Sequence, residues 1–484
     1  MQTSMERTLV FDSQINWTHA AVIEHGRLVE IHRERSKSKD PTESLYLGRV
    51  QQIRPSLCAA FVDIGEEQNA FLPLDENEHI RCGDMILVQG AAKQSVDSKG
   101  LRITRKINLA GKSLVLLPGG SGVHVSKKIK DDDIRKSLKQ FGESFLPPDF
   151  GMIIRTVSAD MTEQFLLDEM HHLIDLWDEI HLKAESARTP GILWARPSLC
   201  ERMIRDLCSA DMASIVTNSE EQYAQLMEWQ RQGIIHAHVM IDYHNESSQL
   251  IFDAYDIESQ IDKALKRRIW LPCGGYLVFD SCEAMTVIDV NSGKMTLGKN
   301  IEETALRVNL EAASEIARQI RLRNTGGMIV ADFIDMSSAE HRNAVLQKLS
   351  EEVRHDRNQV TLLGYTQLGF MEMTRKRTSD ELRKQMRVSC STCSGTGEIL
   401  SGEETAVRIL QQIRRMVISG QRGPFLVKCA NAVADPLSGM INPLESVEIL
   451  VSSSCRHNGK FDIEQISSSD APQGAVALRK RKEI

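Results

Sequence analysis

Hydrophobic and polar residues alternate in short stretches along the first hundred residues of the chain. The stretches at 8–11, 19–23 and 28–31 predict paired strands, and a polar linker follows from residue 33 to residue 43. Further short stretches with glycine-bearing turns are typical of a small barrel. These barrel stretches are residues 47–50, 57–63, 70–74, 85–89 and 101–104.

The apolar spacing becomes largely helical from residue 131 to residue 230, with one apolar strand at 151–156. Helical spacing also predicts helices at 257–268 and 405–419, and residues 424–455 suggest a small mixed unit. The chain therefore combines α/β and α+β parts, and at 484 residues it should form several domains, because single cores rarely exceed about 250–300 residues.

Two apolar runs later in the chain end in carboxylates and are separated by one helix. Asp289 ends the first run, Asp332 ends the second, and residues 301–323 carry apolar side chains at helical spacing. A buried run that ends in a carboxylate usually delivers it to a sheet edge, since an unpaired buried charge is costly. Two such strands in one sheet would place the carboxylates side by side, where they repel unless a hard cation such as Mg²⁺ lies between them.

These residues predict a metal-dependent phosphodiester site. Asn291 projects from the same face of an extended chain as Asp289, so its amide can hydrogen-bond the scissile phosphate or the attacking water. The alternative is that both aspartates are turn or capping residues, but their doubled arrangement at strand ends argues against it. Asp280 and Asp335 are less favoured candidates.

Two aromatic residues of the predicted barrel fall out of phase with its apolar positions. Phe61 lies between Ala60 and Val62, and Phe71 between Ala70 and Leu72. Exposed aromatic side chains on a barrel are platforms for the bases of single-stranded nucleic acid. The alternative is packing against a neighbouring domain. In the following loop Lys93 and Lys99 are either phosphate contacts or solvated lysines.

Arg155 and Thr156 stand at the end of the 151–156 strand. A guanidinium and a hydroxyl both donate hydrogen bonds to a terminal phosphate, although an arginine after a strand more often forms a surface ion pair. Cys390 and Cys393 form a zinc-knuckle-like turn. Structural zinc takes four ligands, so a second copy of the pair would complete the site and tie two protomers together. A reduced, unliganded pair is the alternative.

Composition limits where nucleic acid could bind. The net charge of −7 provides no global basic field, so any such surface is local. The scattered cysteines are typical of a reduced, cytoplasmic protein. The first seven residues show no secretory signal, and no apolar stretch approaches the roughly 20 residues of a membrane helix.

Several motifs, in this order and spacing, resemble the RNase E/G family of endoribonucleases, and the chain's length is similar to that of the shorter, G-type members. The similarity spans roughly residues 5 to 455. The motifs are AAFVDIG at 59–65, IRT at 154–156, EAMTVIDVN at 283–291, IEET at 301–304, RQIRLRN at 318–324, DFIDM at 332–336, EMTRKR at 372–377 and the Cys390/Cys393 turn.

The resemblance implies an RNase H-like fold interrupted by an OB-type RNA-binding barrel and a sensor for the RNA 5′ end. A DNase I-like catalytic domain, a zinc link and a small dimerisation domain with a tail would follow. The expected bounds are 1–39 and 201–264 for the RNase H-like parts, 40–107 for the barrel, 108–200 for the sensor, 265–386 for the catalytic domain, 387–400 for the link and 401–484 for the last domain.

The resemblance also implies an activity. It is Mg²⁺-dependent cleavage of single-stranded RNA, with Mn²⁺ as an alternative ion, in rRNA and tRNA processing and mRNA decay. Substrates with a 5′-monophosphate would be favoured, and the products would carry 5′-phosphate and 3′-hydroxyl ends. A homodimer through shared zinc is implied, with a dimer of dimers left open. A non-catalytic RNA-binding scaffold and a nuclease that acts on DNA are the rival hypotheses.

Site residues carry over from the family by position. Asp289 and Asp332 match the metal ligands and Asn291 the phosphate-orienting amide, whereas Ile64 stands where some members carry an aromatic residue. Residues 456–484 match nothing recognised. The remaining matches are Phe61, Phe71 and Lys99 on the barrel, Gly111, Val115, Arg155 and Thr156 at the 5′-monophosphate pocket, and Cys390 and Cys393 as shared zinc ligands.

Overall fold

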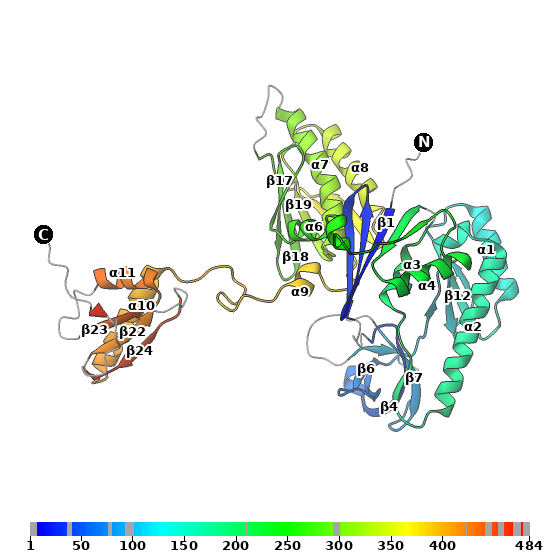
Figure 1. Ribbon diagram of the computed structural model, residues 1–484, viewed down its shortest axis with the longest axis horizontal. Helices are drawn as coiled ribbons and strands as arrows, with labels where there is room; N and C mark the ends of the chain where they lie inside the picture. The colour runs from blue at the N-terminus through cyan, green and yellow to red at the C-terminus, as the bar shows by residue number, and fades with distance from the viewer. Residues whose placement is uncertain are drawn as a thin grey trace. The chain divides into compact units, whose positions relative to one another are not determined.

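The computed structural model describes residues 7–35, 41–75, 80–91, 101–209, 211–293, 301–422, 424–440, 448–453, 459–467 and 476–477. The chain divides into two compact units, Met1–Gln385 and Met386–Ile484 (Figure 1). Among these described residues, the first unit contains four sheets and the second contains one.

A five-stranded sheet, here called the N-terminal sheet, is built from two distant parts of the first unit. Its order is β15-β14-β1-β2-β3. The N-terminal strands form an antiparallel meander, and β1 pairs in parallel with β14, about two hundred residues later. The barrel and a four-stranded sheet are therefore inserted between β3 and β14. The strands are β1 (Arg7–Gln14), β2 (Trp17–Glu24), β3 (Arg27–Arg35), β14 (Met212–Thr217) and β15 (Met240–Tyr243).

The N-terminal sheet is covered by helices on both faces, and neighbouring residues of β1 pack into the two different cores. Leu9 and Phe11 pack with helices α3 (Leu199–Leu207) and α4 (Glu220–Arg231), while Val10 packs with α5 (Ile251–Ala254) and α6 (Ile257–Ala264). Successive side chains of a strand point to opposite faces, so a strand in this position is apolar at consecutive residues. The predicted strands are confirmed, and the helix predicted to residue 268 ends at Ala264.

The barrel is a nearly closed six-stranded sheet. Its order is β6-β5-β4-β7-β8, and β13 pairs with β4. A bridge between Phe71 and Arg102 brings β6 towards β8. The five predicted strands are confirmed, but β5 starts later than predicted because a 3-10 turn at Pro55–Leu57 ends at Cys58 with φ 45°. The strands are β4 (Leu45–Arg54), β5 (Ala59–Asp63), β6 (Ala70–Pro73), β7 (Met85–Gly90), β8 (Ile103–Thr104) and β13 (Gly191–Trp194).

A four-stranded sheet of order β11-β12-β10-β9 follows the barrel and packs with two helices. The strand predicted at 151–156 is confirmed as β12, but β13 and β14 also interrupt the helices between residues 131 and 230 and were not predicted. Apolar runs of four to six residues beside amphipathic helices cannot be separated from helix by periodicity alone. The elements are β9 (Leu109–Ala110), β10 (Leu114–Pro118), β11 (Val123–Val125), α1 (Asp132–Phe145), β12 (Phe150–Ile154), a 3-10 turn at Thr156–Asp160 and α2 (Glu163–Ser186).

A six-stranded sheet of order β16-β17-β18-β19-β21-β20, here called the open-faced sheet, completes the first unit. Helices α7 (Ile301–Leu322) and α8 (Ala339–Val353) cover one face (Figure 1). They bury its apolar side chains, and the other face carries exposed residues such as Asp289 and Asp332. The strands are β16 (Arg268–Trp270), β17 (Tyr276–Ser281), β18 (Met285–Asn291), β19 (Gly327–Asp332), β20 (Val360–Tyr365) and β21 (Met371–Arg375), and a short helix α9 (Leu382–Met386) follows.

Helix α7 also joins the open-faced sheet to the N-terminal sheet. Near its end, Leu322 packs with the core beside β1, and Arg321 forms ion pairs with Glu24 and Glu30 of β2 and β3. One helix therefore belongs to two cores.

The second unit is a small α/β unit with its own core. Its sheet has the order β24-β22-β23-β25, and the core is formed by α10, α11, β22 and β23. The elements are α10 (Gly402–Ile418), β22 (Phe425–Cys429), α11 (Asn431–Gly439), β23 (Ile449–Ser453), β24 (Asp462–Gln465) and β25 (Val476–Ala477).

Among the helices of the described residues, none combines the length and apolar character needed to cross a membrane.

Candidate active site

The two predicted carboxylates meet on the open-faced sheet. Strands β18 and β19 are parallel neighbours, and Asp289 and Asp332 are paired in register. Alternation buries Ile288 and Val290 against α7, which leaves Asp289 and Asn291 on the opposite face. The predicted adjacency is confirmed. The roles assigned to these residues stay a prediction.

The electrostatics of the pair favour a cation. Burial, and then repulsion from Asp289 and Asp335, raise the pKa of Asp332. No lysine, arginine or histidine among the described residues forms an ion pair with Asp289 or Asp332. Asn291 supports the pair, because its Nδ2 donates to Asp289 Oδ2 at 2.7 Å. Two exposed carboxylates side by side on neighbouring strands, without a counter-charge from the described residues, are a suitable donor set for a divalent ion.

The protein supplies only part of a coordination sphere here. Among the described residues, no group of three or more histidine, cysteine, aspartate or glutamate side chains is arranged to hold a metal ion. That fits Mg²⁺, which commonly takes one or two carboxylates and completes its six positions with water and substrate phosphate oxygens. The donor set of Asp289 and Asp332 therefore suits Mg²⁺ bound together with a phosphodiester substrate.

Two residues of α7 hold the segment that follows Asp332, and sequence reasoning missed both. Asn309 is fully buried; its Nδ2 donates to the carbonyl of Ile334 at 2.8 Å, and its Oδ1 accepts from the Ile334 N–H at 3.0 Å. Glu302 accepts from the N–H of Ser338 and the hydroxyl and N–H of Ser337, bonds that lower its pKa to about 2. The available signal was a polar residue, Asn309, inside the apolar stripe of a helix.

The barrel places its two aromatic residues side by side. Phe61 and Phe71 are paired across β5 and β6, with ring centroids 6.0 Å apart at 73°. Both rings are half-buried, while the residues on either side of each phenylalanine in its strand lie in the barrel core. The predicted phase is confirmed, so the two rings form an aromatic platform outside that core. Lys93 and Lys99 lie outside the described residues.

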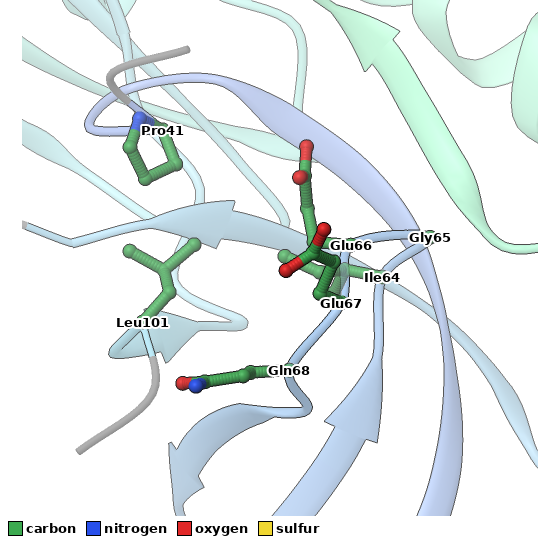
Figure 2. Close-up of a pocket in the computed structure, with 7 residues that line it drawn as sticks. All are labelled: Pro41, Ile64, Gly65, Glu66, Glu67, Gln68 and Leu101. Carbon is green, nitrogen blue, oxygen red and sulfur yellow. The ribbon is translucent and has the colours of Figure 1, made fainter. Parts of the chain in front are cut away.

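A hollow of about 530 Å³ opens on the barrel beside the loop that follows β5, the strand that carries Phe61 (Figure 2). Its lining includes Glu66 and Glu67, whose carboxylates would repel a phosphate backbone. Ile64 also lines it and is 2% exposed within the barrel core, so this position offers no exposed ring for stacking. The hollow is a poor site for RNA. Pro41, Gly65, Gln68 and Leu101 complete its wall.

The residues expected at a 5′-phosphate pocket come together around Arg155. Its Nη1 donates to the carbonyl of Gly111 at 2.8 Å, and its Nη2 donates to Asp206 at 2.9 Å. The hydroxyl of Thr156 lies 3.0 Å from that of Ser126. Val115 lies on β10, which pairs with the strand leading to Arg155. The guanidinium therefore has an ion-pair partner, and a phosphate would have to share or displace it.

Two acidic residues, which the sequence did not indicate, hold the residues around Arg155 in place. Burial alone would raise the pKa of Asp206, but Arg205 and Arg155 outweigh it and the pKa is lowered. Glu169 accepts from the backbone N–H groups of Lys112 and Ser113, which fixes the loop after Gly111. A Cβ on Gly111 would lie 2.5 Å from Glu169 Oε1. Only glycine allows the carboxylate this close to the loop.

The cysteine turn of the second unit presents two sulfurs. The N–H of Gly397 donates to Cys393 Sγ at 3.3 Å, and the backbone N–H groups of Cys393 and Thr392 lower the pKa of Cys390. Amide-to-sulfur bonds favour the thiolate, which is the form that binds metal. The pair fits half of a tetrahedral zinc site.

Asp280, a less favoured candidate for the carboxylate site, forms an ion pair with Arg267 instead.

Comparison with known proteins gives consistent matches. The Ribonuclease E/G family model matches residues 108–378. Ribonuclease G of Salmonella typhimurium and that of Escherichia coli K12 are each 34% identical over 456 residues, covering 90% of this chain and 93% of theirs. Ribonuclease E of Escherichia coli K12 is 35% identical over 437 residues, covering 84% of this chain and 40% of that protein.

Proposed function

Since this chain belongs to the Ribonuclease E/G family, we propose that it is an endoribonuclease that cuts single-stranded RNA with Mg²⁺ at Asp289 and Asp332. The observation that carries the proposal is the parallel pairing of those two exposed carboxylates, with Asn291 hydrogen-bonded to one of them. The activity would serve RNA processing, including rRNA and tRNA maturation and mRNA decay.

The residues around the pair have separate tasks in this mechanism. Asp289 and Asp332 would hold the ion, whose chemistry is to neutralise phosphate charge and lower the pKa of the attacking water. An amide nitrogen has two N–H donors. In Asn291 one of them holds Asp289, which leaves the other for a phosphate oxygen. Attack by water with departure of the 3′ oxygen gives 5′-phosphate and 3′-hydroxyl ends.

Substrate binding would extend from this centre to the barrel and the 5′-end pocket. Phe61 and Phe71 would stack on bases, a contact worth about 1–3 kcal/mol per base; their adjacent, half-buried rings support this role. Arg155 and Thr156 would donate to a 5′-monophosphate, which suits the pocket better than a triphosphate in size and charge. Lys93 and Lys99 would contact phosphates.

The finer domain assignment and the assembly are also proposals. The N-terminal sheet would be the RNase H-like part, the barrel an OB-type module, the four-stranded sheet the 5′ sensor and the open-faced sheet the DNase I-like part. Cys390 and Cys393 would share a zinc ion with the same pair of a second protomer. Replacing Cys393 with serine should release zinc and shift the dimer to monomer in sedimentation; an unchanged oligomer would contradict the zinc link.

The test of the function uses one short AU-rich single-stranded RNA with either a 5′-monophosphate or a 5′-hydroxyl, in Mg²⁺ or EDTA. We expect internal cleavage only with Mg²⁺, and faster cleavage of the monophosphate form. Binding without cleavage under every condition would favour a non-catalytic RNA scaffold. Equal cleavage of the matching single-stranded DNA would favour a nuclease without RNA specificity.

A further inference from the structure

A second row of side chains crosses the open-faced sheet beside the carboxylates. Trp270 of β16 is paired with Tyr276 of β17, and Tyr276 is paired with Asn291 of β18. Directly paired residues of neighbouring strands project from the same face. Trp270, Tyr276 and Asn291 therefore lie in one row, next to the row that holds Asp289 and Asp332.

The outer part of this row is aromatic and accessible. The ring centroids of Trp270 and Tyr276 are 5.2 Å apart at 61°, and the guanidinium carbon of Arg268 lies 4.5 Å from the centroid of Tyr276. Trp270 is 55% exposed, whereas Ile269 between Arg268 and Trp270 is buried against the core. An indole this exposed is not part of the core; it packs against the ring of Tyr276, and that ring in turn carries the Arg268 guanidinium.

The position of the row limits what could bind there. Two strand spacings of about 4.8 Å put Trp270 roughly 10 Å from Asn291, along the line of hydrogen bonds between strands. A polymer whose phosphate is held at Asn291 and the carboxylates would place a neighbouring nucleotide over Tyr276 and Trp270. A nucleobase offers a flat face for stacking, and Arg268 offers a positive charge to the adjoining backbone.

We propose that Trp270, with Tyr276 and Arg268, forms a stacking subsite for a base one or two nucleotides from the scissile phosphate. The inference rests on the proposed RNA cleavage at Asp289 and Asp332, and it adds a base contact on the catalytic sheet itself. This contact would help to select the bond that is cut, because an unstacked base would leave the phosphate poorly positioned at Asn291.

The experiment compares Trp270→Ala and Trp270→Phe with wild type on one short single-stranded RNA cut at a single bond. A matched set of RNAs carries an abasic nucleotide at each of the two positions on either side of that bond. We expect Trp270→Ala to lower kcat/KM by about 5- to 150-fold, the range of one lost stacking contact. Trp270→Phe should recover most of that loss.

The abasic RNAs identify the stacked nucleotide. At one position the missing base should slow the wild type as much as Trp270→Ala does, and the variant should lose nothing further on that RNA. Tyr243→Ala is the control. Tyr243 is also an exposed aromatic residue (40%), and its ring centroid lies 6.1 Å from that of Tyr223, but it belongs to the edge strand β15 of the N-terminal sheet and not to this row. Its kcat/KM should match that of the wild type.

A second measurement separates the subsite from the reaction. The Asp289→Asn protein and its Trp270→Ala derivative are compared for binding of the intact and abasic RNAs. Weaker binding that depends on both Trp270 and the same base supports the subsite even if the wild type cleaves nothing, in which case only the proposed function fails. Equal effects of Trp270→Ala on every RNA, or none on any, in both cleavage and binding would overturn the subsite.

Discussion

Two pairs of carboxylates lie beside α7, and they have opposite surroundings. The side chains of Glu24 and Glu30 in the N-terminal sheet are only 10% and 8% exposed, and both carboxylates share Arg321, whose Nη2 lies 2.9 Å from an oxygen of each. Arg357 adds a further ion pair to Glu30. Asp289 and Asp332 of the open-faced sheet are exposed, and the described residues give them no counter-charge.

The pKa directions express the same difference. Burial alone would raise the pKa of Glu30, but Arg357, His32 and Arg321 outweigh it and the pKa lies well below its usual value. For Asp332, burial and repulsion act in the same direction, and the pKa is raised. The buried pair is already neutralised and therefore stabilises the fold. The exposed pair has no such partner among the described residues, which makes it the candidate site for chemistry.

The largest effect should follow a change in the exposed pair. Replacing Asp289 or Asp332 with asparagine should lower kcat about 10³-fold or more, because charge stabilisation by a bound metal is worth several kcal/mol. The thermal midpoint should stay the same or rise slightly, since a like-charge repulsion disappears. Single-turnover cleavage and calorimetry on the same preparations would test this. An active, well-folded variant would show that the metal lies elsewhere.

The buried pair should respond in stability instead. Arg321→Met leaves Glu24 and Glu30 without their shared partner and should lower the free energy of unfolding by about 3–5 kcal/mol. Arg307→Met on the same helix is the control, because Arg307 forms a surface pair with Glu311 at 3.8 Å and should change stability by at most about 0.5 kcal/mol. Urea titration of both variants would measure the two changes in the free energy of unfolding. Equal losses of that free energy would mean that the buried ion pairs contribute little.

Acid should weaken the buried pair in a defined direction. The folded pKa of Glu30 is below the value of 4.5 expected for an unpaired glutamate, so its contribution is fully present above pH 4.5 and declines as pH falls through the folded pKa. Glu30→Gln should cost about 1.5–3 kcal/mol at pH 7. The difference from wild type should shrink below pH 4.5. A constant difference down to pH 3 would contradict the assignment.

Asn309 tests how far the exposed pair depends on α7. Asn309→Leu removes both hydrogen bonds to the backbone of Ile334, two residues after Asp332, and leaves those groups buried. We expect a loss of about 1–3 kcal/mol in stability and a roughly 10-fold lower kcat with KM unchanged, since about 1.4 kcal/mol of misplacement suffices for that factor. Asn309→Ser is the milder comparison. A stability loss with normal kcat would make Asn309 purely structural.

The parts of the molecule that could be predicted are those where strand alternation decides position. Asp289, Asp332, Phe61 and Phe71 each lie on the face that their apolar neighbours leave open, so the sequence alone was sufficient. Asp206 was not predictable, because it is 51 residues from its partner Arg155 and reaches it only through the tertiary fold.

Short strands and isolated polar residues explain the other omissions. Strand β16 has only three residues, too few to show an alternation that would have pointed Trp270 outward. The role of Asn309 in α7 was not predicted, because nothing in a helix pattern reveals which backbone a buried amide will contact.

Arg155 and Asp206 lie between the two extremes, and the smallest effect is expected there. Their side chains are 30% and 23% exposed, so the pair is neither fully buried nor open. A 5′-monophosphate must share the guanidinium with Asp206, which reduces its gain from the usual 1.5–3 kcal/mol for a charged hydrogen bond. Arg155→Gln should therefore remove a roughly 5- to 10-fold rate advantage of 5′-monophosphorylated RNA and leave 5′-hydroxyl RNA unaffected.

Asp206→Asn is the informative partner variant, because it frees the guanidinium and should increase that advantage. If both variants slow the two RNAs equally, Arg155 supports the fold through Asp206 and Gly111 and does not sense the 5′ end.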